Sequence, residues 1–174
     1  MTDSHADALA LSRTVLRLLR SLVLLAGALI LALLIASLTS ETFVMTALGA
    51  RPALGNAALI LGMRLIMVIG IGTVPVVYFV LTRLLAIVES VRDGNPFVVA
   101  NAERLKAIAW SLVGLELLHF VVGAIAASVS TNSIPLNVSW GFSLTRWLAA
   151  LLLFVLAGVF EQGARMREEL DVTI

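Results

Sequence analysis

The chain has 174 residues, of which 60% are hydrophobic and 13% are charged, and it contains no cysteine. A water-soluble domain of this length could not bury so much apolar surface in one core, so the composition excludes a soluble globular protein. The lack of cysteine excludes disulfides, thiolate metal sites and thiol nucleophiles. The formal net charge of +1 gives no sign of a direct nucleic-acid-binding surface.

Four long apolar stretches predict an all-α integral membrane protein, an antiparallel bundle of four transmembrane helices in one domain over residues 1–174. A helix needs about 20 apolar residues to cross a hydrocarbon core of about 30 Å. The predicted segments are a cytoplasmic N-terminal segment at 1–17, spans at about 18–39, 57–88, 105–129 and 142–161, and a cytoplasmic tail at 162–174. Because Pro75 has no amide hydrogen, we expect a helix kink in the second span.

Lysine and arginine are distributed unevenly along the chain. They precede the first span, flank the connection between the second and third spans, and follow the fourth: Arg13, Arg17, Arg20, Arg83, Arg92, Arg104, Lys106, Arg165 and Arg167. Positive residues near span ends tend to stay in the cytoplasm. We therefore expect a protein of the cytoplasmic (inner) membrane with both termini and the middle connection inside, and with the connections near residues 40–57 and 129–142 outside.

The first span could instead be the apolar core of a secretory signal peptide, with the three preceding arginines as its basic region. Its apolar run is longer than such signals use, and no small-x-small cleavage site follows it. A retained membrane anchor is the favoured interpretation.

Apolar and polar residues alternate between Ile134 and Leu144, a pattern of period two that is typical of an extended strand. A lone strand is unstable. We expect a short β element in the outer connections, paired with residues 43–46, with another protomer or with the lipid interface.

Small residues recur at four-residue spacing in two of the spans, a pattern that lets transmembrane helices approach closely. The first span carries Ala28, Ala32 and Ala36, and the third carries Gly123 and Ala127. Either stripe could be a helix interface, and either could arise by chance in an alanine-rich chain.

The middle connection carries the signals of a tight helical hairpin. Gly94 can take the left-handed conformation that ends a helix. We expect Asn95 to cap the next helix and Pro96 to open it, since a proline at the first helical position loses no hydrogen bond. Residues 101–106 then form a polar helical lead-in, and Trp110 is placed for the inner membrane interface.

The motifs Gly94-Asn-Pro-Phe97 and Asn101-Ala-Glu-Arg-Leu105, followed by Trp110, resemble a bacterial membrane-protein family called domain of unknown function 2975. The ending at 159–174 is similar to that family's ending, in which a phenylalanine and a glycine precede an acidic pair and a terminal Thr-aliphatic step. The resemblance covers about residue 15 to the end. Val98 departs from it, because the family more usually has a hydroxyl residue there that suits helix capping.

The resemblance implies a four-span protein without an assigned reaction, often encoded beside a small helix-turn-helix regulator. We therefore expect the inner face to bind a cytosolic partner, plausibly such a transcriptional regulator. The residues expected to bind it are Gly94, Asn95, Pro96, Phe97, Asn101, Arg104, Glu168 and Glu169. Glu161 precedes Arg165 in the favourable i,i+4 order, so we expect the fourth helix to continue past the membrane. The stretch from Leu170 to Ile174 is then short and β-prone, and it could pair with a partner's sheet, clasp the Asn95–Phe97 turn, or form a frayed end.

Three ionisable residues fall within the spans: Arg64, Glu116 and His119. Charges in hydrocarbon are costly and usually mark a site, so we expect an intramembrane polar cluster. Glu116 and His119 are three apart and share one helical face, and we expect Arg64 to pair with Glu116 with His119 beside them. The cluster could be a proton-sensitive or ligand-binding site, or it could only fix helix register. Alternatively, Arg64 reaches the outer interface and Glu116 is protonated. Glu116-x-x-His119 is a single copy of a motif that di-iron bundles need twice, so we expect no metal and no other cofactor.

The sequence contains no motif with established catalytic mechanics, and we expect no catalytic residue and no enzyme activity. The leading hypothesis is a regulatory or scaffold membrane protein that binds a cytosolic partner. The alternative is a small transporter or channel that forms a homo-oligomer and uses Arg64, Glu116 and His119 along its path.

Overall fold

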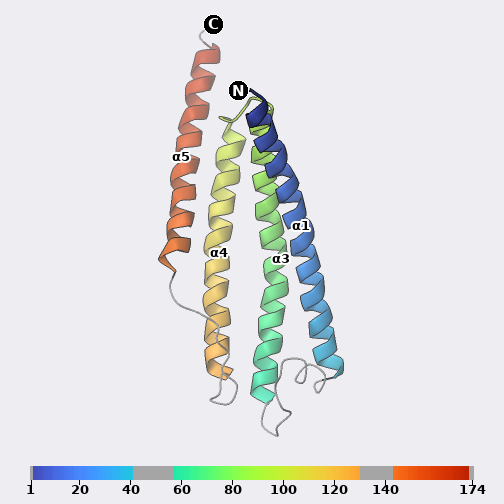
Figure 1. Ribbon diagram of the computed structural model, residues 1–174. Coiled ribbons are helices and arrows are strands. Elements are labelled where there is room, and N and C mark those ends of the chain that lie inside the picture. The colour runs from blue at the N-terminus through green and yellow to red at the C-terminus, as the bar shows by residue number, and fades with distance from the viewer. Residues whose placement is uncertain (1, 41–56, 130–142, 173–174) are drawn as a thin grey trace. The chain divides into compact units, whose positions relative to one another are not determined.

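The computed structural model describes residues 2–40, 57–129 and 143–172. The described residues form four long helices, which are α1 (Thr2–Thr39), α3 (Ala57–Arg92), α4 (Val99–Val129) and α5 (Leu144–Val172) (Figure 1). Each helix contains a stretch that is long and apolar enough to cross a membrane. The predicted all-α, four-span membrane protein is confirmed.

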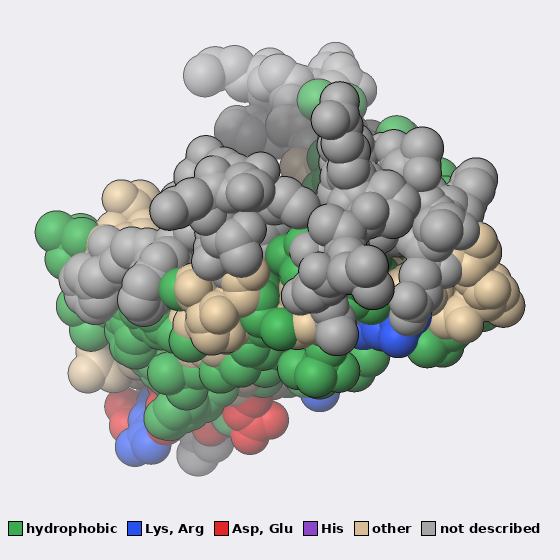
Figure 2. All heavy atoms as spheres, turned by 90° about the horizontal axis from the view of Figure 1, so that it is seen from below, with side chains coloured by type: hydrophobic (Ala, Val, Ile, Leu, Met, Phe, Trp, Pro, Cys, Tyr) green, Lys and Arg blue, Asp and Glu red, His purple; other side chains and the backbone are tan. Residues whose placement is uncertain are grey.

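Large apolar side chains lie mainly on the surface of the helices. Between 11% and 17% of the most apolar stretch of each helix is buried inside the protein. Leu29 of α1 is 62% exposed and Leu152 of α5 is 66% exposed. Hydrophobic side chains also cover much of the described surface seen in Figure 2. Such a surface is compatible with lipid and not with water, so the protein is a multi-pass membrane protein.

The helices extend beyond the predicted spans at several ends. Helix α5 continues to Val172, so the prediction of a β-prone segment after Leu170 is wrong for residues 170–172. No proline interrupts this stretch, and Glu161 pairs with Arg165 one turn later at 2.9 Å, which favours continued helix. The hydropathy of the sequence detects only the part of a helix that lies in hydrocarbon.

Helix α3 is helical on both sides of Pro75, which lies inside it. The kink expected at this residue stays a prediction.

The predicted β element falls mostly at 134–142 and its proposed pairing segment at 43–46, and both lie outside the described residues. Leu144, the last residue of the alternating pattern, is the first residue of helix α5.

The chain divides into two compact units. Unit 1 comprises Met1–Leu22, Val76–Gly114 and Ser143–Ile174, and unit 2 comprises Val23–Pro75 and Leu115–Phe142. In unit 1, the N-terminal part of α1, the α3–α4 turn and the C-terminal part of α5 lie toward the same end (Figure 1). A chain that crosses a membrane an even number of times has both ends on the same side, and this arrangement agrees with that.

Close helix contacts in unit 2 are made at glycines. A Cβ atom added to Gly27 of α1 would lie 2.9 Å from a methyl group of Val74, and one added to Gly62 of α3 would lie 2.7 Å from Val129. Ala28 and Ala32 are exposed, so the stripe predicted on α1 lies one residue away from the buried face. In the other predicted stripe, Gly123 is buried and Ala127 is exposed.

Small side chains also line the buried face of α5 in unit 1. Ala150, Ala157 and Ala164 follow one another at seven-residue spacing, and none of them is more than 4% exposed. Residues seven apart lie on the same face of a helix, so this face can approach its neighbour closely. Helix α4 supplies Ala102 and Ala109, which are also buried in this unit.

Candidate functional site

The turn between α3 and α4 ends α3 with a Schellman motif. Gly94 has a φ of +76°, in the left-handed region. Its amide donates to the Val91 carbonyl at 3.1 Å, and the amide of Asn95 donates to the Ser90 carbonyl at 3.0 Å. These two bonds satisfy carbonyls that a helix end would otherwise leave unpaired. The conformation predicted for Gly94 is confirmed.

The start of α4 differs from the prediction. The helix begins at Val99, so Asn95 does not cap it and Pro96 does not open it. The Asn101 amide instead donates to the Val98 carbonyl at 2.9 Å, which makes Val98 the residue before the first helical turn. Asn95 cannot serve as a cap because its backbone belongs to the motif that closes α3. The polar helical segment predicted at 101–106 is confirmed.

Asn101 is the buried centre of the turn, with 0% of its surface exposed. Its side-chain amide donates to the Pro96 carbonyl at 2.8 Å and to the Ser90 hydroxyl at 2.9 Å. The Ser90 hydroxyl in turn donates to the Asn95 carbonyl at 2.6 Å. One side chain therefore joins the end of α3, the turn and the start of α4, and a fully bonded network of this kind fixes a single geometry.

Arg104 completes the network from the first turns of α4. One guanidinium nitrogen, Nη1, donates to the Asn101 side-chain oxygen at 2.7 Å and to the Ala86 carbonyl at 3.3 Å. The Ala86 carbonyl belongs to α3, so Arg104 also links the two helices. Because Nη1 makes both bonds, the guanidinium is held at one edge.

An open hollow of about 350 Å³ lies beside this network in unit 1. It is lined by Ala86, Glu89, Ser90, Asp93, Asn95, Val98, Ala100 and Arg104. The lining combines two carboxylates with one guanidinium, and Asp93 and Asn95 are exposed. The hollow therefore offers negatively charged acceptors and a positively charged donor beside the hydrogen-bonded network of Asn101.

Two ion pairs tie the neighbouring helices to the hairpin of α3 and α4. Arg13 of α1 lies 3.3 Å from Glu89 of α3, and Lys106 of α4 lies 2.7 Å from Glu161 of α5. Such partly exposed pairs contribute little stability each. These ion pairs instead position α1 and α5 against α3 and α4, the helices that line the hollow.

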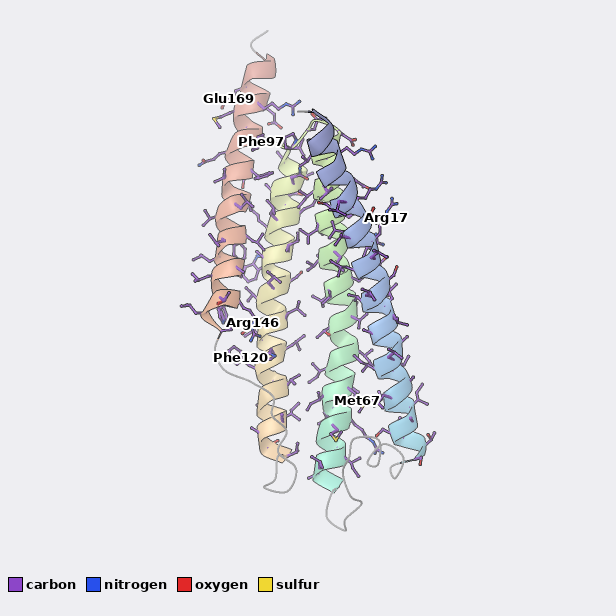
Figure 3. The ribbon with its side chains drawn as sticks, viewed as in Figure 1. Arg17, Met67, Phe97, Phe120, Arg146 and Glu169 are labelled. Carbon is purple, nitrogen blue, oxygen red and sulfur yellow. The ribbon has the colours of Figure 1, made fainter. Side chains whose placement is uncertain are left out.

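Phe97 joins the turn to α5, as Figure 3 shows. Its ring centroid is 5.2 Å from that of Phe160, and a Cβ atom added to Gly163 would lie 2.8 Å from its Cδ1. The ring therefore occupies the space that the missing side chain of Gly163 leaves. Phe97 is still 44% exposed, so part of its ring remains accessible. The two segments that carry the family resemblance are in contact.

The remaining predicted residues of this face lie on the last turns of α5. Glu168 and Glu169 are exposed, together with Met166 and Arg167. Gly163 is level with Phe97, so the helix continues past the α3–α4 turn by about 13 Å at about 1.5 Å per residue. This part of α5 projects past the turn as helix as far as Val172.

The predicted intramembrane cluster lies in unit 2, and Arg64 has a partner there that the sequence did not suggest. Its Nε donates to the Ser37 hydroxyl at 3.2 Å, and its Nη2 donates to the Ser37 carbonyl. Ser37 is in the last turn of α1, where carbonyls lack helical partners and attract a positive charge. Arg64 therefore caps the end of α1.

Glu116 is 5% exposed and His119 lies one turn later on α4. Residues three apart share one face of a helix, as predicted. The pairing of Arg64 with Glu116 stays a prediction, as does the choice between a functional and a structural role.

Sequence reasoning missed three residues of these sites: Ser90, Gly163 and Ser37. Ser90 lies five residues before Asn95, which is the separation that the Schellman bond spans, so the motif itself could have pointed to it. Gly163 was noted only as the glycine of the family-like ending, and Ser37 gave no local signal. Their roles depend on Phe97 and Arg64, which are distant in the sequence.

One of three comparisons with known proteins places the chain in a family. A search of curated proteins and a search of solved structures each found no match to the chain. A family model described as "Protein of unknown function (DUF2975)" matches residues 63–174, a shorter range than the resemblance suggested. The match includes the α3–α4 turn, the buried Asn101 network and all of α5. The chain belongs to the DUF2975 family of membrane proteins of unknown function.

Proposed function

We propose that this multi-pass membrane protein is a non-enzymatic regulatory or scaffold protein that binds a cytosolic partner. The binding surface comprises the hollow beside Asn101, the exposed part of Phe97 and the projecting end of α5; we call it the turn face. The observation that carries the proposal is the hollow itself. Its lining residues Ser90 and Arg104 are hydrogen-bonded to the buried Asn101 side chain, whose nitrogen and oxygen both have partners. Preorganised surfaces lose less entropy on binding.

Two further features support a protein partner. The turn face combines charged residues, such as Asp93 and Glu168, with the exposed apolar side chains of Phe97 and Met166. Aromatic residues and methionine are enriched at protein interfaces, and the mixed charges can set the orientation of a partner. Arginine and lysine concentrate near this end of the helices, which supports a cytoplasmic orientation.

The candidate partner is a small helix-turn-helix regulator, and binding can be measured with both proteins purified. The chain is placed in lipid nanodiscs and titrated with the regulator encoded nearest to it. Asp93→Arg changes the lining of the hollow and should weaken binding at least tenfold. Glu103→Arg makes the same charge change at an exposed residue of α4 that does not line the hollow, and it should leave binding unchanged. Equal binding by both variants would contradict the proposal.

A transporter or channel is the second candidate, and Glu116 is the observation that favours it. This carboxylic acid is 5% exposed and is the sole charged residue between residues 107 and 129. Buried acids in membrane helices often serve ion or proton paths. Glu116→Gln should then reduce ion or proton flux into liposomes, and a lack of flux in the unmodified protein under any gradient would eliminate this candidate.

A further inference from the structure

Two arginines of unit 1 lie on aromatic rings instead of beside carboxylates. The Arg20 guanidinium on α1 is 4.5 Å from the centroid of the Tyr78 ring on α3, and its Nη2 also donates to the Tyr78 hydroxyl. The ring holds the cation by its π-electrons while the hydroxyl fixes one nitrogen. The other guanidinium donors are left for a further ligand.

Arg83 has a similar arrangement on one helix. Its guanidinium is 4.8 Å from the centroid of the Phe79 ring, one turn earlier on α3. Arg83 is exposed and Phe79 is 39% exposed, so this pair lies on the outer surface of the helix. The phenylalanine ring has no oxygen or nitrogen acceptor, so it pairs with none of the five guanidinium donors of Arg83.

Both arginines lie level with a second aromatic pair in the same unit. Helices α3 and α4 run in opposite directions, and the hydrogen bond from Arg104 to the Ala86 carbonyl shows which residues of the two helices lie at the same level. Trp110, six residues after Arg104, therefore lies level with Val80, six residues before Ala86. Trp110 is 66% exposed and packs edge-on against Phe154 of α5 with a centroid distance of 5.4 Å. A belt of exposed aromatic residues at one level is typical of the boundary between hydrocarbon and lipid headgroups.

The charge-free part of α3 supports the same boundary. Residues 65–82 carry no charged side chain and extend about 27 Å at about 1.5 Å per residue, close to the thickness of a hydrocarbon core. Arg83 is the first charged residue after this segment. Arg20 likewise precedes the charge-free segment 21–40, which includes the rest of α1.

Neither arginine has a carboxylate partner among the residues that the structure describes. Arg13, Lys106 and Arg165 each lie within 4.0 Å of a glutamate, whereas no carboxylate oxygen of a described side chain lies within that distance of Arg20 or Arg83. A guanidinium near hydrocarbon that lacks a protein anion binds a lipid phosphate favourably, because the pair forms charge-assisted hydrogen bonds.

We propose that Arg20 with Tyr78, and Arg83 with Phe79, are two binding sites for the phosphate groups of anionic lipids. The aromatic ring positions the guanidinium at headgroup depth, and the neighbouring apolar side chains contact the acyl chains. This proposal does not depend on the turn face or on any protein partner. A failure of the partner-binding experiment would leave it intact.

Native mass spectrometry of the full-length protein tests the proposal, using detergent micelles supplemented with phosphatidylglycerol or with phosphatidylcholine. The unmodified protein should retain phosphatidylglycerol preferentially. Arg20→Gln and Arg83→Gln should each weaken this retention about fivefold, which corresponds to about 1 kcal/mol for one basic side chain near a membrane surface. Arg167→Gln removes an exposed arginine from the projecting end of α5 and should have no effect.

Two further arms keep the test decisive. Phe79→Leu keeps the charge of Arg83 and removes the ring, so it should weaken lipid retention because the guanidinium is no longer positioned. This variant tests the Arg83 site independently of Arg20→Gln, which could fail to fold. Excess inorganic phosphate should not displace the lipid, because the acyl chains add apolar contacts that free phosphate lacks. Complete displacement by phosphate, equal retention of the two lipids, or unchanged retention in Arg83→Gln would each overturn the proposal.

Discussion

Phe97 packs directly against Gly163, so the turn between α3 and α4 is locked to α5 at a position where only a hydrogen atom fits. A Cβ atom at Gly163 would lie 2.8 Å from Cδ1 and 3.3 Å from Cγ of the Phe97 ring. Both residues belong to the segments that identify the family. Contact between these two motifs joins the turn and α5 in one continuous surface.

Gly163→Ala should therefore destabilise the protein. The added methyl group overlaps the ring of Phe97, and overpacking of this kind costs about 1–3 kcal/mol. Thermal unfolding in detergent should show a lower midpoint. Gly158→Ala is the matched control on the same helix, because nothing lies within 4 Å of its added Cβ. A midpoint that falls equally in both variants would show that the Phe97 contact is unimportant.

Asn101→Ala should destabilise the turn more than any exposed substitution near it. The change removes the donor to Pro96 and Ser90 and the acceptor for Arg104, leaving buried polar groups unpaired, and we expect a loss of about 2–3 kcal/mol. Thermal unfolding with tryptophan fluorescence can measure it. Asn95→Ala is the control, since its side chain is exposed and makes one long bond of 3.5 Å. Equal stability of the two variants would refute the central role of Asn101.

Gly94→Ala should weaken the end of α3. A left-handed φ of +76° costs a residue with a Cβ about 1 kcal/mol, whereas glycine adopts it freely. Gly114→Ala, inside α4 with nothing within 4 Å of the added Cβ, should be neutral or stabilising. Hydrogen exchange of the amides of residues 94 and 95 measures the effect locally. Unchanged exchange rates in Gly94→Ala would contradict the prediction.

The contact between Gly62 and Val129 can be tested by rescue. Gly62→Ala places a Cβ atom 2.7 Å from a methyl group of Val129 and should destabilise unit 2 by about 1–3 kcal/mol. Adding Val129→Ala removes that methyl group and should restore much of the loss, as a double-mutant cycle of unfolding midpoints would show. Gly72→Ala is the control with an open environment. Additive effects of the two substitutions would mean that these residues do not pack together.

The fold was largely predictable because hydropathy and length determine membrane spans directly. The conformation of Gly94 was also predictable, because a helix end with glycine in that position has a local signature. The continuation of α5 past the membrane was predicted from the order of Glu161 and Arg165, whereas its extent to Val172 was not, since hydropathy detects only the part of a helix that lies in hydrocarbon. The start of α4 was misplaced because Asn95 and Pro96 suit a helix start, although the backbone of Asn95 is already used to close α3.

The candidate site was predicted in outline and not in its architecture. Asn101 and Arg104 were selected through the family resemblance, but their burial and bonding depend on Ser90 and Ala86 of another helix. The small-residue pattern on α1 pointed to alanines, while the close contact is made by Gly27 against Val74. Spacing along one helix cannot show which face a partner helix covers.

The central claim is that the turn face lies in the cytoplasm, and the absence of cysteine makes it directly measurable. Single-cysteine variants Asp93→Cys, Glu168→Cys and Ser133→Cys can be treated in intact cells with a membrane-impermeant maleimide. The account predicts labelling of the cysteine at position 133 alone, with the other two labelled only after the cells are permeabilised. Labelling at position 93 or 168 in intact cells would place the turn face outside and contradict the account.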